Sequence, residues 1–172
     1  MTAYVALLRG VNLLGVSTLK MADLKAIADK LGLKQARTYI ASGNLLFVSN
    51  KAEQPLRRAL EQEMKAHMGR ELRVMLRTAA EMAEVVEANP FADSPGNRVQ
   101  AFFLNEAPPT DLKKTARNQD DERIATGSRE VFVAYGEKCI GKSRLRLPAA
   151  EAGTARNMNT VAKLAQLAKE MA

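Results

Sequence analysis

Four short segments of almost unbroken apolar residues constrain the fold of this 172-residue chain more than any other feature. They span residues 5–8, 45–48, 99–104 and 131–135, and polar or turn-forming residues end each one. This pattern is typical of buried strands, in which neighbouring side chains point to opposite faces. Exposing such a face to water costs roughly 25 cal/mol per Å² of apolar surface. We therefore expect helices to cover one face of each sheet and the other half of the chain to cover the second face.

The first half of the chain has a regular order of helix and strand patterns. Apolar residues recur at helical spacing over 21–31, before Gly32, and again from Pro55 to Gly69. A glycine after each stretch suits the left-handed residue that often ends a helix. A strand pair separates the two helices and another strand follows at 72–76. The predicted order of strand, helix, strand, strand, helix, strand is that of a ferredoxin-like α/β plait.

The second half repeats this scheme imperfectly. It predicts a helix at 79–88, a boundary loop at 89–97, a strand at 99–104, a short helix at 109–118, a hairpin of 122–126 with 130–135, and a final helix around 158–171. A last strand is missing from this order. We therefore predict an α+β fold of two ferredoxin-like α/β-plait subdomains packed together, 1–78 and 79–172, the second incomplete.

The composition excludes several classes of site. Cys139 and His67 are the only residues of their types, which excludes an intrachain disulfide, a cysteine-rich zinc site and most catalytic triads. We expect no metal and no cofactor. No apolar run approaches the roughly 18 residues of a membrane span and no signal peptide is evident, so we expect a cytoplasmic protein without membrane association. The net charge of +7 permits an anionic partner.

Polar residues follow the first strand and fill the turn of the first hairpin. In a plait the first two strands run parallel, so Arg9 and Asn12 should share one sheet edge with Ser42 and Asn44. Arginine offers a fork of donors for phosphate or carboxylate, and loop amides beside glycine can cradle an anion. The alternative is that the two asparagines cap their own turns while Arg9 pairs with a carboxylate.

A second polar cluster lies near the C-terminus. Lys142 lies in a Gly-Lys-Ser-Arg run, and Arg156 and Asn157 fall at the predicted start of the last helix. Helix N-termini offer unpaired amide donors and attract anions. The alternative is that Thr154 or Asn157 caps the helix and Arg156 is a surface charge.

The same clusters resemble a known family. The matching motifs are Leu-Leu-Arg-Gly-Val-Asn at 7–12, Lys20-Met21, Arg-Thr-Tyr-Ile-Ala-Ser-Gly-Asn at 37–44, Asn-Pro-Phe at 89–91 and Thr-Ala-Arg-Asn-Met-Asn-Thr-Val-Ala-Lys-Leu at 154–164. They resemble, in order and along nearly the whole chain, the bacterial family called domain of unknown function sixteen-ninety-seven. The resemblance implies two α/β-plait subdomains and no particular activity. Many members have an aromatic residue where this chain has Met158, which argues against a stacking role there.

Our leading hypothesis is a cytoplasmic binding protein for an anionic, phosphate-bearing ligand. One alternative is an enzyme acting on a small phosphorylated or carboxylated substrate held by Arg9, Lys142 and Arg156, for which the sequence offers no catalytic residue. Another is a protein-interaction module whose motifs are only structural. Nucleic acid is a less favoured partner, because plaits that bind RNA use exposed aromatic residues. Aromatic residues make up only 5% of this chain. The sequence leaves the oligomeric state open.

Overall fold

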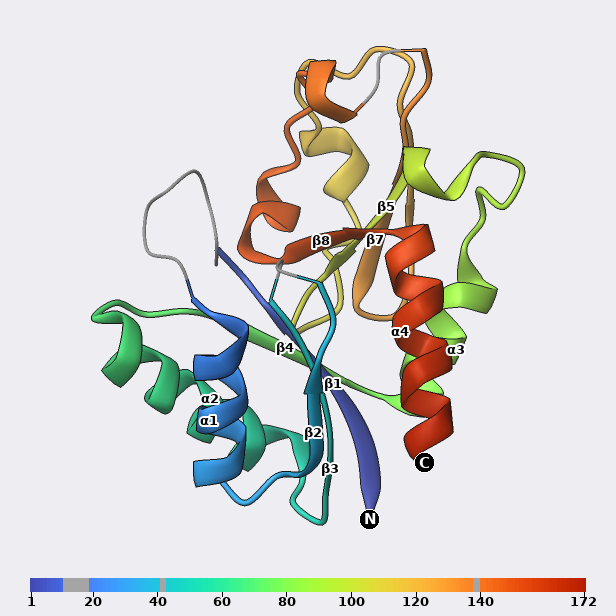
Figure 1. The fold of residues 1–172 in the computed structure, drawn as a ribbon. Helices are drawn as coiled ribbons and strands as arrows, with labels where there is room; N and C mark the ends of the chain where they lie inside the picture. The colour runs from blue at the N-terminus through green and yellow to red at the C-terminus, as the bar shows by residue number, and fades with distance from the viewer. Residues whose placement is uncertain (11–18, 41–42, 138–139) are drawn as a thin grey trace. The chain divides into compact units, whose positions relative to one another are not determined.

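Two four-stranded antiparallel sheets and four α-helices form the framework of the chain (Figure 1). The computed structural model describes residues 1–10, 19–40, 43–137 and 140–172. Packing divides the chain into a first unit, Met1–Ala83 with Leu164–Ala172, and a second unit, Glu84–Lys163. Compact units need not be independently folding domains, so the ranges 1–78 and 79–172 stay a prediction.

The first unit contains the predicted order of elements. They are β1 (Thr2–Leu8), α1 (Met21–Lys30), β2 (Lys34–Thr38), β3 (Asn44–Ser49), α2 (Glu53–Met68) and β4 (Val74–Thr78), followed by α3 (Ala79–Ala88). The strands lie in the order β2-β3-β1-β4. β1 is therefore central, and it is antiparallel to both of its neighbours.

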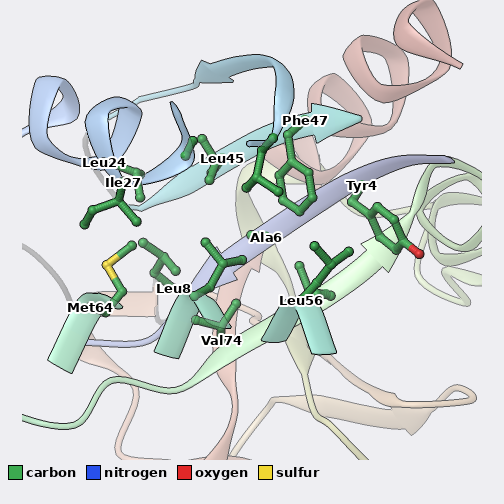
Figure 2. Packing of buried hydrophobic residues seen from close by; sticks show 14 of the residues in the cluster. Tyr4, Ala6, Leu8, Leu24, Ile27, Leu45, Phe47, Leu56, Met64 and Val74 are labelled. Atoms are coloured by element: carbon green, nitrogen blue, oxygen red, sulfur yellow. The ribbon is translucent and has the colours of Figure 1, made fainter. Parts of the chain in front are cut away.

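Helices α1 and α2 cover one face of this sheet (Figure 1). Their apolar stripes pack on side chains from β1, β3 and β4 to form a single cluster (Figure 2). Gly32 and Gly69 follow the two helices with φ of +70° and +72°, the left-handed conformation predicted for them. On the opposite face of the sheet Val5, Leu7 and Met75 are also buried. The prediction that β1 is buried on both faces is confirmed.

The second unit also has four strands, which corrects the prediction of a missing strand. They are β5 (Val99–Phe103), β6 (Arg123–Thr126), β7 (Glu130–Ala134) and β8 (Thr154–Asn157), in the order β6-β7-β5-β8. β8 pairs with β5, with Thr154 opposite Phe103 and Asn157 opposite Gln100. The sequence showed no strand here because polar residues, Thr154 and Arg156, occupy its buried positions.

The described connections between the strands of the second unit contain 3₁₀ turns and no α-helix. The predicted helix at 109–118 is only a 3₁₀ turn, Leu112–Thr115, and further 3₁₀ turns are Gly96–Arg98, Ile140–Lys142 and Pro148–Ala152. The last helix, α4, spans Met158–Met171. No helix in the described ranges is long and apolar enough to cross a membrane.

The end of α4 packs with the first unit. Arg37 on β2 donates from Nη2 to the carbonyl oxygen of Leu167 at 3.1 Å, and the same nitrogen lies 3.9 Å from Glu170 Oε2. These contacts join segments separated by 130 positions in the sequence.

Candidate functional site

The end of β1 lies between the β2–β3 hairpin and the start of β4. Leu8 N donates to Gly43 O at 2.9 Å, and Arg9 N donates to Arg73 O at 3.0 Å. Leu7 is paired with Asn44 in the register of β1 with β3. Arg9 is therefore the next residue after Leu8, whose backbone N–H donates to the hairpin. Asn12 and Ser42, the other two residues predicted for this edge, lie outside the described residues.

Three arginines gather at this end of the sheet. Leu8 faces Val74 across the strands, and the Arg9–Arg73 hydrogen bond extends this register by one position. Leu8 and Val74 point into the helix-covered core, so Arg9 and Arg73 point together to the opposite face. Both side chains are exposed. Arg70 joins them by donating from Nη2 to Gly10 O at 2.7 Å.

We call Arg9, Arg70 and Arg73 the arginine edge. Two carboxylates of the same region bind elsewhere: Glu61 Oε1 accepts from Val74 N at 3.1 Å, and Glu71 Oε1 lies 3.2 Å from Lys65 Nζ. Within the described ranges, no carboxylate pairs with a guanidinium of the arginine edge. Like charges directly opposite on neighbouring strands destabilise a sheet. An anion bound between them would remove this repulsion.

Arg70 also contains a buried donor. Its Nε atom is buried and has no hydrogen-bond partner in the part of the chain that the structure describes. A buried donor without a partner is unfavourable by about 1–3 kcal/mol. The sequence patterns did not indicate Arg70 and Arg73 as site residues. The plait order could have found them, because it places the start of the fourth strand beside the end of the first.

Asn44 has a structural role in the hairpin. It is fully buried, its Nδ2 donates to Tyr39 O at 3.0 Å, and Tyr39 N donates to Asn44 O at 3.1 Å. The side chain thus holds the turn closed, which agrees with the alternative considered for it. Its contribution to the site is to fix Gly43 beside β1.

The structure does not place the C-terminal candidates at an open helix end. Arg156 lies in β8, where it is 7% exposed. Its Nη1 donates to Thr154 Oγ1 at 2.6 Å and to Ala155 O at 2.9 Å. Burial lowers the pKa of Arg156 to about 10, so it remains charged at neutral pH. The alternative that made it a surface charge is wrong.

Asn157 and Lys142 have no shared role. Asn157 Oδ1 accepts from Thr160 N at 3.0 Å and so caps the first turn of α4. Lys142 is exposed at the end of a 3₁₀ turn and makes no hydrogen bond or ion pair with the described residues. The structure brings Arg156 and Asn157 together as consecutive residues of one strand, and it shows no contact of Lys142 with them.

A buried carboxylate lies elsewhere in the second unit. Glu122 Oε1 accepts from Ser143 Oγ at 2.5 Å, and its Oε2 accepts from Asp120 N at 2.6 Å. Burial alone would raise the pKa of Glu122, but these hydrogen bonds outweigh it and the pKa is lowered. A carboxylate with a lowered pKa is a weak base at neutral pH. The pair therefore ties a loop to the start of β6 and does not form an activated serine.

An open groove of about 330 Å³ lies between α1 and α2. Lys30 Nζ pairs with Glu63 Oε2 across the groove at 2.7 Å, and His67 Nε2 lies 3.5 Å from Asp23 Oδ2. The described residues contain no group of three or more His, Cys, Asp or Glu placed to hold a metal ion. The groove thus offers a ligand fewer unpaired charges than the arginine edge does.

The aromatic side chains of β1 and β3, Tyr4 and Phe47, offer nucleobases no exposed surface on which to stack. Tyr4 and Phe47 stack on each other with ring centroids 5.6 Å apart, and both are buried in the cluster under α1 and α2 (Figure 2). Recognition of single strands by plaits requires aromatic rings that bases can reach. Tyr4 and Phe47 are therefore core residues.

Comparison with known proteins places the chain in a family. A search of the curated proteins finds no match to it. Among solved structures, the conserved bacterial protein SP0830 from Streptococcus pneumoniae is similar, with a TM-score of 0.79 and 25% sequence identity over 98% of this chain and 99% of that chain. The family model described as "Protein of unknown function (DUF1697)" matches residues 1–132. The chain belongs to this DUF1697 family.

Proposed function

We propose that this protein binds an anionic, phosphate-bearing ligand at the arginine edge. One observation carries the proposal: Arg9 and Arg73 are directly opposite on neighbouring strands, both exposed and without a carboxylate partner in the described part of the chain. Two exposed arginines held side by side in this way repel each other when the site is empty. A phosphate group bound between them would turn that repulsion into two charge-assisted contacts.

The geometry suits phosphate in two further respects. Each guanidinium presents a planar fork of donors that matches two oxygens of a phosphate group. Arg70 is already oriented by its bond to Gly10 O, so less side-chain freedom is lost when a ligand binds. Of the five described residues among the seven predicted from the sequence, Arg9 belongs to this site. Asn44 supports it, and Lys142, Arg156 and Asn157 are not part of it.

We also propose a fold family and a cellular location for the protein. We assign both sheets to the ferredoxin-like α/β plait, supported by their common strand orders β2-β3-β1-β4 and β6-β7-β5-β8. Within this assignment the second unit has 3₁₀ turns where the first has helices. The predicted location in the cytoplasm is kept as part of the proposal, supported by the single cysteine.

Binding of inorganic pyrophosphate tests the proposal. Thermal unfolding of the wild type is compared with that of R9Q and R73Q, with R58Q as a matched control that removes an exposed arginine from α2. A ligand at 100 times its Kd stabilises the folded state by about 2.7 kcal/mol. We expect pyrophosphate to stabilise the wild type and R58Q, and to have a much smaller effect on R9Q and R73Q at the same concentration.

Sodium chloride at matched ionic strength is the second control. If chloride raises the melting temperature as much as pyrophosphate does, the effect is charge screening and the proposal is wrong. The proposal also fails if R9Q and R73Q respond to pyrophosphate as the wild type does.

A further inference from the structure

Two segments of the second unit, 112–117 and 140–147, lie side by side. Arg117 and Arg146 form an antiparallel bridge in which the backbone N of each donates to the O of the other at 2.9 Å. Apolar side chains of both segments pack on one core cluster: Leu112, Ala116, Ile140, Leu145 and Leu147. The same segments contain no carboxylate and six exposed cations: Lys113, Lys114, Arg117, Lys142, Arg144 and Arg146. We call these six residues the basic surface.

The arginines of the basic surface point to the same side. Paired residues on neighbouring antiparallel strands project to one face, so Arg117 and Arg146 do so together. Arg144 and Arg146 are exposed and alternate with Ser143, Leu145 and Leu147, as side chains of an extended segment do. Leu147 is buried, and Ser143 Oγ donates to the buried Glu122. Arg144 therefore projects outward with the other two.

Most of these cations have no anionic partner. Arg146 is neutralised by Glu151, whose Oε1 lies 2.7 Å from both Nε and Nη2 of the guanidinium. The other five side chains make no ion pair and no hydrogen bond with any residue that the structure describes. Unpaired cations gathered on one surface produce a local positive potential that attracts polyanions.

The spacing of the cations suits a partner with several phosphate groups. Residues two apart in an extended segment are separated by roughly 6.6 Å, and residues paired as Arg117 and Arg146 are have Cα atoms about 5.5 Å apart. The cations thus form a row and do not converge on one phosphate. Attachment to a lipid bilayer would also need apolar anchors. The exposed large apolar residues in the described ranges, Met1, Met21 and Ile40, all belong to the first unit.

We infer that the basic surface binds the phosphate backbone of nucleic acid without reading its bases. This surface is distinct from the arginine edge, because its residues belong to the other unit and bind a row of phosphates. Contacts with the backbone need no aromatic platform for stacking, since phosphate contacts position a protein and carry no sequence information. Binding is stabilised by release of the counterions that the phosphates hold.

Fluorescence anisotropy of a labelled DNA duplex tests the inference. Five cations that each neutralise one phosphate give a slope of log K against log salt of about −4.5, a loss of affinity of roughly 500-fold between 50 and 200 mM salt. R117Q and R144Q each remove one contact and should reduce the steepness of the slope by about 0.9. A second duplex of unrelated sequence should bind the wild type equally well.

Two variants serve as controls. R58Q makes the same change in net charge on α2 of the first unit and should keep the wild-type slope. R117K keeps the charge and should also keep it, which separates the loss of a cation from an effect on the fold. R9Q and R73Q should bind the duplex as the wild type does, while R117Q and R144Q should keep the wild-type response to pyrophosphate. The two proposals can therefore fail separately.

Four results would overturn the inference. The first is no binding of the duplex at 50 mM salt, and the second is a wild-type slope in both R117Q and R144Q. The third is a slope reduced as much by R58Q as by R144Q, because net charge alone would then explain binding. The fourth is binding to phosphatidylserine vesicles that is equally sensitive to R144Q, because the surface would then accept any anionic partner.

Discussion

Replacing Arg73 with glutamine should stabilise the empty protein. Arg9 and Arg73 project to the same face from directly opposite positions. For guanidinium groups about 7 Å apart in water, Coulomb's law gives a repulsion of about 0.6 kcal/mol. Cross-strand pairs in sheets contribute about 0.2–1 kcal/mol, which agrees with this value. We therefore expect R73Q to raise the free energy of unfolding by about 0.6 kcal/mol and the melting temperature by about 1–2 °C.

Salt provides the internal check on this mechanism. At 1 M ionic strength the screening length is about 3 Å, so the difference between R73Q and wild type should disappear. The assay is urea unfolding in phosphate-free buffer, at low salt and at 1 M sodium chloride, for the wild type, R73Q and R58Q. The reasoning is refuted if R73Q is less stable than the wild type at low salt. Equal gains in R73Q and R58Q would also refute it, because they would reflect the net charge of +7 and not the local pair.

Two further predictions concern the second unit. Since the pKa of Glu122 is lowered in the folded state, its ionised form stabilises the fold above its usual pKa of 4.5, and this stability is lost as the pH falls through the lower folded-state pKa. E122Q should therefore have a flatter dependence of melting temperature on pH below 4.5, and identical slopes for variant and wild type would contradict this. N157A removes the cap of α4 and should destabilise the protein by about 1 kcal/mol in urea unfolding. N157S should recover most of this loss, and both variants should keep the wild-type response to pyrophosphate, since Asn157 lies outside the proposed site.

The sequence predicted the parts of the fold that depend on local pattern. Runs of apolar residues located β1, β3, β5 and β7, and glycine located the ends of α1 and α2. β8 could not be found in this way, because its buried positions hold Thr154 and Arg156, and the hydrogen bond between these two side chains makes their burial tolerable. β8 is a strand because it pairs with β5. The pattern of apolar and polar residues along the sequence carries no information about that pairing.

The candidate site was predicted in part for a similar reason. Arg9 stood out because it interrupts an apolar run beside a glycine. In the sequence, Arg70 and Arg73 look like ordinary surface charges at the start of a strand. Only the pairing of β4 with β1 shows that they lie near Arg9. Arg156 and Asn157 have the composition of an anion site at a helix end. Burial and capping, which depend on tertiary structure, give them other roles.

The division of the chain between its two units has a consequence for synthesis. The first unit needs Leu164–Ala172, yet the 80 residues of Glu84–Lys163 lie between this segment and the rest of that unit. At about 5–20 residues per second, translation reaches Leu164 roughly 4–16 s after Ala83. During this interval Arg37 lacks its acceptor on Leu167 and the sheet lacks the end of α4. The first unit can therefore complete its packing only after all of the second unit has been synthesised.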